Sequence, residues 1–227
     1  FSDCDGITYI HMLDGILSIG ERVFADSDAL VSVELPGTLA KLGNSAFQNC
    51  KSLKSVTLPD SLTILGEEAF SGCAALETVV LSKGLTSIPS YAFKGCESLK
   101  EIVIPASVKT IEPNAFLGCT SLEKIVFEVE EEIISGDTED NESKEEKGKG
   151  KNESEKEPVI DENAIVIYHG LVTIKTHAFH NCESLKEVVL PMTVQNIEYL
   201  AFDNPKLTVK TTLKEEEKPE GWEEGWH

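Results

Sequence analysis

Apolar residues return along this chain at a fixed step of 23 positions. The residue that marks the step most clearly is a phenylalanine, preceded by alanine in every copy except the first, which has Val23. Aliphatic residues stand five and eight positions before it. The series is Phe24, Phe47, Phe70, Phe93, Phe116, Phe179 and Phe202. Self-similarity at this period is typical of a solenoid, in which stacked repeats bury their apolar faces against one another.

One copy of the repeat shows which elements to expect. Ile102 and Ile104 alternate with Val103, which predicts a short strand, and Pro105 closes it because proline cannot donate to a strand ladder. The Ala-Phe-x-x-Cys segment that follows is too short for a full helix, so it predicts one helical or 3-10 turn at a corner. Stacking aligns the strands into a parallel sheet, and eight coils would give a stack roughly 35–40 Å long.

The full pattern Leu-x-x-Val/Ile-x-Leu-Pro-x-x-Leu-x-x-Ile-Gly-x-x-Ala-Phe-x-x-Cys resembles the BspA-like, or Treponema-type, leucine-rich repeat. The resemblance covers nearly the whole chain apart from residues 136–158. It implies an α/β repeat fold, mostly β: a right-handed leucine-rich-repeat solenoid with a parallel concave sheet and short helical or 3-10 corners. It also implies a secreted or cell-surface protein with a role in protein binding or adhesion and no catalytic residues.

We expect one solenoid over residues 1–227. The end of the chain, Glu217–Trp222 followed by Trp226, is similar to a segment that often follows such arrays in Firmicutes. We therefore expect a C-terminal capping segment at about 207–227. The chain begins at Phe1 without methionine, and Asp5–Ile10 already enters a coil, which favours a processed chain or an excised part of a longer one.

The formal net charge is −20, and half of it lies between Glu128 and Asn163. Such a charge argues against nucleic acid and anionic membrane surfaces as partners. No apolar run in the sequence approaches the length of a membrane span, so we expect no membrane insertion.

The repeat is interrupted once. From Ile125 to Ile165 the distance is 40 residues, which predicts a degenerate coil that carries 17 extra residues, with Ile134 in its return segment. The corner of this coil would be replaced by Gly136–Pro158, a segment rich in Glu, Lys, Ser, Asn and Gly. Low hydrophobicity and dense charge predict an acidic flexible loop on the side away from the sheet.

Two alternatives attach to this loop. Asp137, Glu139, Asp140 and Glu142 cluster closely, but they lack the central glycine and distal glutamate of a calcium loop, so a solvated loop is favoured. Asn141 and Asn152 begin glycosylation sequons, which matter only if the source is a secreting eukaryote.

Five of the six cysteines share one repeat position. These are Cys50, Cys73, Cys96, Cys119 and Cys182. Neighbouring Cα atoms about 4.8 Å apart lie within bridging range, but parallel side chains do not suit a disulfide. Buried thiols that act as small hydrophobes are the favoured interpretation, with Cys4 outside the ladder and free.

His177, His180 and Cys182 suggest a metal cluster by spacing alone. Cys182 belongs to the buried series, however, and the two histidines occupy variable corner positions, so a solvated pair is favoured. The sequence shows no glycine-rich phosphate loop and no nucleophile beside a plausible base. We predict no metal, no cofactor and no enzymatic activity.

The strand residues between the core positions define a candidate binding surface. They are Glu34, Thr57, Thr78, Val80, Glu101, Val103, Lys124, Val126, Val166, Glu187 and Val189. One column is polar at Glu34 and Thr57 and then becomes valine throughout. Exposed contiguous apolar surface usually signifies contact with a partner. A ladder of valines also stabilises a sheet without any ligand, so both interpretations stay open.

Two function classes follow. The first is an adhesin-like binding module whose concave sheet recognises a protein or glycan of a host or cell surface. The second is a structural spacer, a stalk that holds another domain and binds nothing itself. The sequence leaves the partner and the oligomeric state open.

Overall fold

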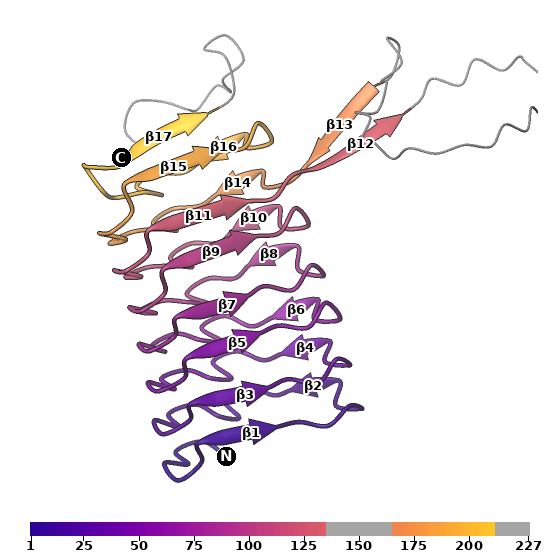
Figure 1. Ribbon diagram of the computed structural model, residues 1–227, viewed down its shortest axis with the longest axis vertical. Helices are drawn as coiled ribbons and strands as arrows, with labels where there is room; N and C mark the ends of the chain where they lie inside the picture. The colour runs from indigo at the N-terminus through magenta and orange to yellow at the C-terminus, as the bar shows by residue number, and fades with distance from the viewer. Residues whose placement is uncertain (135–164, 212–227) are drawn as a thin grey trace, which may run out of the picture. The chain divides into compact units, whose positions relative to one another are not determined.

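The computed structural model describes residues 1–134 and 165–211. It divides into two units, one formed by Phe1–Glu130 with His169–His227 and the other by Glu131–Tyr168. The larger unit is a solenoid of about seven turns, built from parallel strands (Figure 1).

The longer strands of each coil form one face, which we call the front sheet. They are β1 (Tyr9–His11), β3 (Ser32–Glu34), β5 (Ser55–Thr57), β7 (Thr78–Val80), β9 (Glu101–Ile104), β11 (Lys124–Phe127), β15 (Glu187–Leu190) and β17 (Thr208–Thr211). The pairings between neighbouring strands of this face are parallel, and the first coils pair in register at the repeat distance, as Tyr9 with Ser32 and Ser55 with Thr78. The pattern of alternation therefore predicted these strands correctly.

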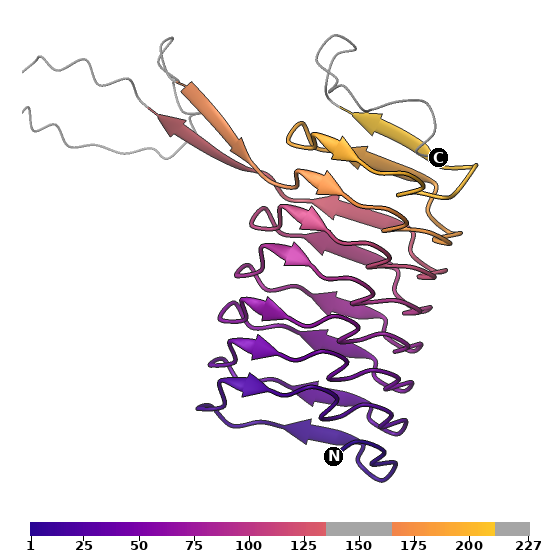
Figure 2. The same cartoon turned by 180° about the vertical axis from the view of Figure 1, so that it is seen from behind.

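A second set of two-residue strands forms what we call the back sheet, seen from behind in Figure 2. They are β2 (Ser18–Ile19), β4 (Lys41–Leu42), β6 (Ile64–Leu65), β8 (Ser87–Ile88), β10 (Thr110–Ile111), β14 (Thr173–Ile174) and β16 (Asn196–Ile197). In each, the second residue is buried and the first points outward or is half-buried. Each of these strands thus contributes one aliphatic side chain to the core.

The core between the sheets is a stack of phenylalanine rings. Successive rings from Phe24 to Phe202 lie 5.1–5.6 Å apart between centroids and are nearly parallel. The rings from Phe47 onward are at most 1% exposed. Phe1 also belongs to the stack, with its ring centroid 5.7 Å from that of Phe24. The sequence series, which begins at Phe24, did not include it. The fixed step in sequence is therefore a fixed position in the core.

The predicted helical or 3-10 corners are wrong, because the described residues contain no helix. From Phe24 to Phe179, the residues two before and two after each phenylalanine of the stack have positive φ, as at Ser45 (53°) and Asn49 (58°) around Phe47. A helix needs consecutive residues with negative φ, so this alternation prevents it. It sends alternate N–H groups to the next coil instead, as from Phe47 to the carbonyl of Ala69 at 2.8 Å.

The cysteines are free and follow the phenylalanines, as predicted. Each thiol of the buried series donates to the phenylalanine carbonyl one coil earlier, as Cys73 Sγ does to Phe47 at 3.1 Å. Burial raises the pKa of these thiols, to about 12 for Cys50 and Cys182. The placement of Cys4 outside the ladder is wrong: it stands 23 residues before Ser27, which fills the same position in the next coil.

The interpretation of the interruption is also wrong. No degenerate coil lies between the two halves of the repeat array, because β14 pairs directly with β10 and the ring of Phe179 stacks on Phe116 at 5.1 Å. The chain leaves the solenoid unit between β11 and β14, before the corner rather than in place of it. A single coil is thus interrupted, and its corner is intact.

The second unit holds a two-stranded sheet of β12 (Glu130–Ile134) and β13 (Ile165–His169). The acidic loop at 136–158, its acidic cluster and both sequons lie outside the described residues. Of the capping segment at about 207–227, the first residues form β17, which pairs with β15, and the remainder from 212 lies outside the description.

Candidate functional site

The front sheet presents two outward columns of side chains, because successive residues of a strand point to opposite faces. Val33, Val56, Val79, Ile102 and Ile125 point into the core between them. Ten of the eleven predicted site residues occupy the two columns. The core therefore fixes the spacing of the surface residues from one coil to the next.

The valines of the second column are exposed over the later coils. Val80 is 50% exposed, Val103 38% and Val189 49%, and Val126 is half-buried. Val126 pairs in register with Val103, and β15 with Val189 lies beside β11 (Figure 1). Together these four residues, which we call the valine patch, form one apolar strip across neighbouring strands.

Two ion pairs lie beside the valine patch, one within the first column and one between the first column and Lys210 of the second. Lys124 Nζ lies 2.7 Å from Glu101 Oε1, and Lys210 Nζ lies 2.7 Å from Glu187 Oε2. All four side chains are about half exposed, so each pair contributes little to stability. Their effect is to neutralise charge around the valine patch in an otherwise acidic chain.

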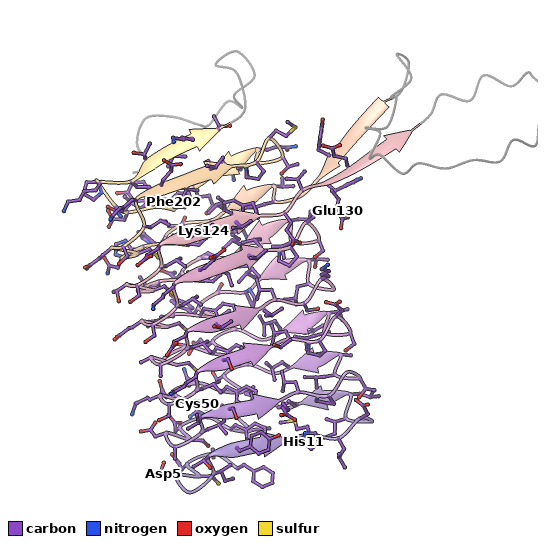
Figure 3. All side chains as sticks on the ribbon, in the orientation of Figure 1. Asp5, His11, Cys50, Lys124, Glu130 and Phe202 are labelled. Atoms are coloured by element: carbon purple, nitrogen blue, oxygen red, sulfur yellow. The ribbon has the colours of Figure 1, made fainter. Side chains whose placement is uncertain are left out.

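The first coils of the front sheet are polar. His11 Nδ1 lies 2.6 Å from Glu34 Oε2, and Tyr9 also bonds this carboxylate. The hydrogen bond with Tyr9, followed by that with His11, lowers the pKa of Glu34, and the same carboxylate raises the pKa of Tyr9. Figure 3 labels His11 on β1 and Lys124 on β11.

Val166 is the one predicted site residue that does not belong to this surface. It lies on β13 in the second unit, because the strand at 165–169 pairs with β12 and not with the front sheet. The error follows from treating the interruption as a complete coil.

Residues at both ends of the two columns were missed. Tyr9 and His11 stand one repeat before Ser32 and Glu34, so the step of 23 could have found them. Thr208 and Lys210 pair with Glu187 and Val189 at a step of 21, so the period alone could not find them. In this last coil, which is two residues shorter, the buried side-chain amide of Asn204 donates a hydrogen bond to the carbonyl of Leu185 at 2.7 Å.

The histidine pair lies at the corner. The rings of His177 and His180 are 5.1 Å apart between centroids, and His180 Nδ1 lies 2.8 Å from Asp203 Oδ2. Cys182, the third member of the suggested cluster, is buried and its thiol donates to the carbonyl of Phe116. Across residues 1–134 and 165–211, no group of three or more His, Cys, Asp or Glu side chains is arranged to hold a metal ion.

These features define a parallel-strand solenoid of the leucine-rich repeat class, with an inward leucine, isoleucine and phenylalanine framework and variable outward columns. The BspA type leucine-rich repeat region matches residues 1–136 and 161–218 in six copies. The chain belongs to this family of BspA-type leucine-rich repeat proteins, a family of repeat scaffolds.

Solved structures of bacterial leucine-rich repeat proteins share the fold. One from Eubacterium ventriosum has a TM-score of 0.63 at 20% identity and covers 96% of this chain and 45% of its own. One from Bacteroides ovatus has a TM-score of 0.62 at 22% identity and covers 94% and 54%. The leucine-rich repeat protein of T. pallidum has a TM-score of 0.54 at 31% identity and covers 56% and 59%.

This chain therefore spans about half the length of those three proteins. No curated protein matches it. Within the part of the chain that the structure describes, no helix is long and apolar enough to cross a membrane.

Proposed function

We propose that this chain is an extracellular binding module, adhesin-like, which holds a protein partner against the valine patch of the front sheet. The observation that carries the proposal is the contiguous exposure of Val80, Val103 and Val189 beside Val126. Polar residues occupy the same column at His11, Glu34 and Thr57, so strand formation by itself does not require valine there.

The physical argument for a protein partner rests on burial and charge. Fully burying a valine side chain contributes at least about 1.5 kcal/mol, so covering the exposed half of each of these valines contributes roughly 1 kcal/mol. The flanking pairs Glu101–Lys124 and Glu187–Lys210 leave no uncompensated charge of their own to desolvate. A flat apolar strip with a neutral polar rim is the surface that protein interfaces use.

Family membership supports display at a cell surface, because the BspA-type repeat is usually found in secreted and surface proteins. A stalk that binds nothing is the competing function. The two differ in whether the front sheet has a partner to lose.

An array of purified extracellular-matrix and host-surface proteins tests the proposal. The wild-type chain should bind at least one protein, and Val80→Glu with Val189→Glu should abolish that binding, because the new charges are solvated in the free protein and desolvated in a complex. Lys94→Glu, on the exposed corner, is the matched control and should leave binding unchanged. Binding that survives the valine changes would place the site elsewhere and overturn the proposal, whereas no binding to any protein of the array favours the stalk.

A further inference from the structure

The back sheet carries a groove that the front-sheet function does not use. It has a volume of about 590 Å³ and runs across β2, β4 and β6 as far as Pro89. Its floor is formed by Gly20, Gly43 and Gly66, one from each of three successive coils. Figure 2 shows these strands as the indigo-to-violet arrows of the back sheet.

The close approach of successive coils requires glycine at these positions. A Cβ added at Gly43 would lie 2.6 Å from the carbonyl carbon of Gly20, so any side chain would collide with the preceding coil. The stacking of these coils therefore leaves a trough between the columns of side chains on either side. In the later coils, residues with side chains stand at the equivalent positions.

In the later coils the repeat position of these glycines is held by Pro89, Glu112, Lys175 and Glu198. Lys175 Nζ lies 2.8 Å from Glu112 Oε2, and Glu198 accepts from the backbone N–H and the hydroxyl of Thr176. The column is thus filled and internally paired in one half of the solenoid and open in the other.

The walls of the groove carry exposed polar side chains. Ser18 and Lys41 stand on one wall with Ile64, which is 52% exposed, and Glu21, Asn44 and Glu67 stand on the other. Among the described residues, Lys41, Glu21 and Glu67 form no ion pair and no side-chain hydrogen bond with one another or with their neighbours. The side-chain oxygen of Asn44 accepts from the Glu67 N–H at 3.1 Å.

We propose that this groove is a second binding site, which takes a neutral oligosaccharide of two or three pyranose units. A pyranose presents hydroxyl groups at its edge and C–H groups on its faces. The edge matches the carboxylates, amide and ammonium of the walls, and the faces match the glycine floor, Ile64 and Pro89. A unit in an extended glycan advances by a distance similar to the ~4.8 Å rise between coils.

Charge and hydrogen bonding select this class of ligand over others. Two unpaired carboxylates against one ammonium, in a chain of net charge −20, oppose an anionic glycan. A peptide strand would need free backbone groups on the floor, but these are used between and within coils: Gly43 donates to Ile19 at 2.9 Å and accepts from Ala46 at 3.3 Å. Recognition therefore depends on the side chains of the walls.

Saturation-transfer NMR with a panel of trisaccharides tests the proposal. The panel contains neutral hexose and N-acetylhexosamine trisaccharides together with sulfated and sialylated ones. At least one neutral trisaccharide should bind. Lys41→Ala with Glu67→Ala should weaken that binding by at least about tenfold, which corresponds to about 1.4 kcal/mol.

The matched control is Asn196→Ala, which removes an exposed polar side chain from the column of Lys41 at the filled end of the back sheet. It should leave trisaccharide binding unchanged, as should Val80→Glu with Val189→Glu on the front sheet. Far-UV circular dichroism checks that each variant is folded. The proposal is overturned if no neutral trisaccharide binds, if only anionic ones do, or if the groove variant binds as well as wild type.

Discussion

The first three coils and the later coils share one interior and differ on both outer faces. The stacked rings from Phe24 to Phe70 have the same spacing as those from Phe116 to Phe202. Yet the second column of the front sheet changes from polar residues to valines along the stack. On the back sheet, the position held by Gly20, Gly43 and Gly66 in the first coils is held by the paired Glu112 and Lys175 in later ones. The difference shows that the core sets the backbone, and that each coil is then free to vary its outward side chains.

The largest expected effect tests the shared interior. Phe70→Ala should cost about 3–5 kcal/mol of unfolding free energy, because a large ring between two neighbours is truncated where the backbone cannot collapse. Phe202→Ala should cost less, because the core becomes thinner toward β17, where Val209 is only partly buried. Urea denaturation of both variants measures the difference, and equal small losses would show that the ring stack does not carry the stability.

Gly43→Ala tests the close contact between the first two coils at the glycine positions of the back sheet. The added Cβ would meet the backbone of Gly20, so we expect a loss of about 1–3 kcal/mol, typical of overpacking. Glu112→Ala, at the same repeat position in a later coil, should cost at most about 1 kcal/mol because its side chain lies outside the core. Thermal melts of the two variants compare them, and equal costs would contradict the contrast between the halves.

The buried thiols of the later coils predict a loss of stability at high pH. Burial raises the pKa of Cys96 well above 9.0, so above that value the unfolded chain loses a proton that the folded chain keeps. The contribution of the Cys96 thiol to the free energy of unfolding is therefore fully present below pH 9. It falls by about 1.4 kcal/mol per pH unit as the pH rises beyond that value.

Cys96→Ser is the variant for this test, since Ser27 already occupies the same position in the first complete coil and its hydroxyl donates to the carbonyl of Phe1 at 3.2 Å. Urea denaturation at pH 7, 9 and 10 should show a shallower decline for the variant than for wild type. Parallel declines would mean that Cys96 does not stay protonated in the folded chain.

The smallest effect concerns the paired back column. Lys175→Ala should cost about 0.5–1 kcal/mol, because the Lys175–Glu112 pair is partly exposed and partly screened. Lys41→Ala, at an unpaired lysine of the open groove, should cost less. Salt should reduce the first cost and leave the second unchanged, and a salt-independent loss at Lys175 would show that the pair is not responsible.

The sequence by itself determined the interior of this protein. A step of 23 with inward Leu, Ile, Phe and Cys positions predicts parallel strands, the ring stack and free buried thiols, because each side chain must meet its equivalent in the next coil to leave water. The same step places Glu34, Thr57, Val80 and Val103 on the outward columns of the front sheet. The resemblance to BspA-type repeats rests on those same residues.

Only the tertiary structure decided the corners, the interruption and the groove. The corners are turns because backbone conformations at Ser45 and Asn49 and their equivalents are set by hydrogen bonds to the next coil, which local spacing does not reveal. Val166 was misplaced because apolar alternation does not say which strand is the partner. The groove depends on how closely Gly20, Gly43 and Gly66 stack, and that distance exists only between coils.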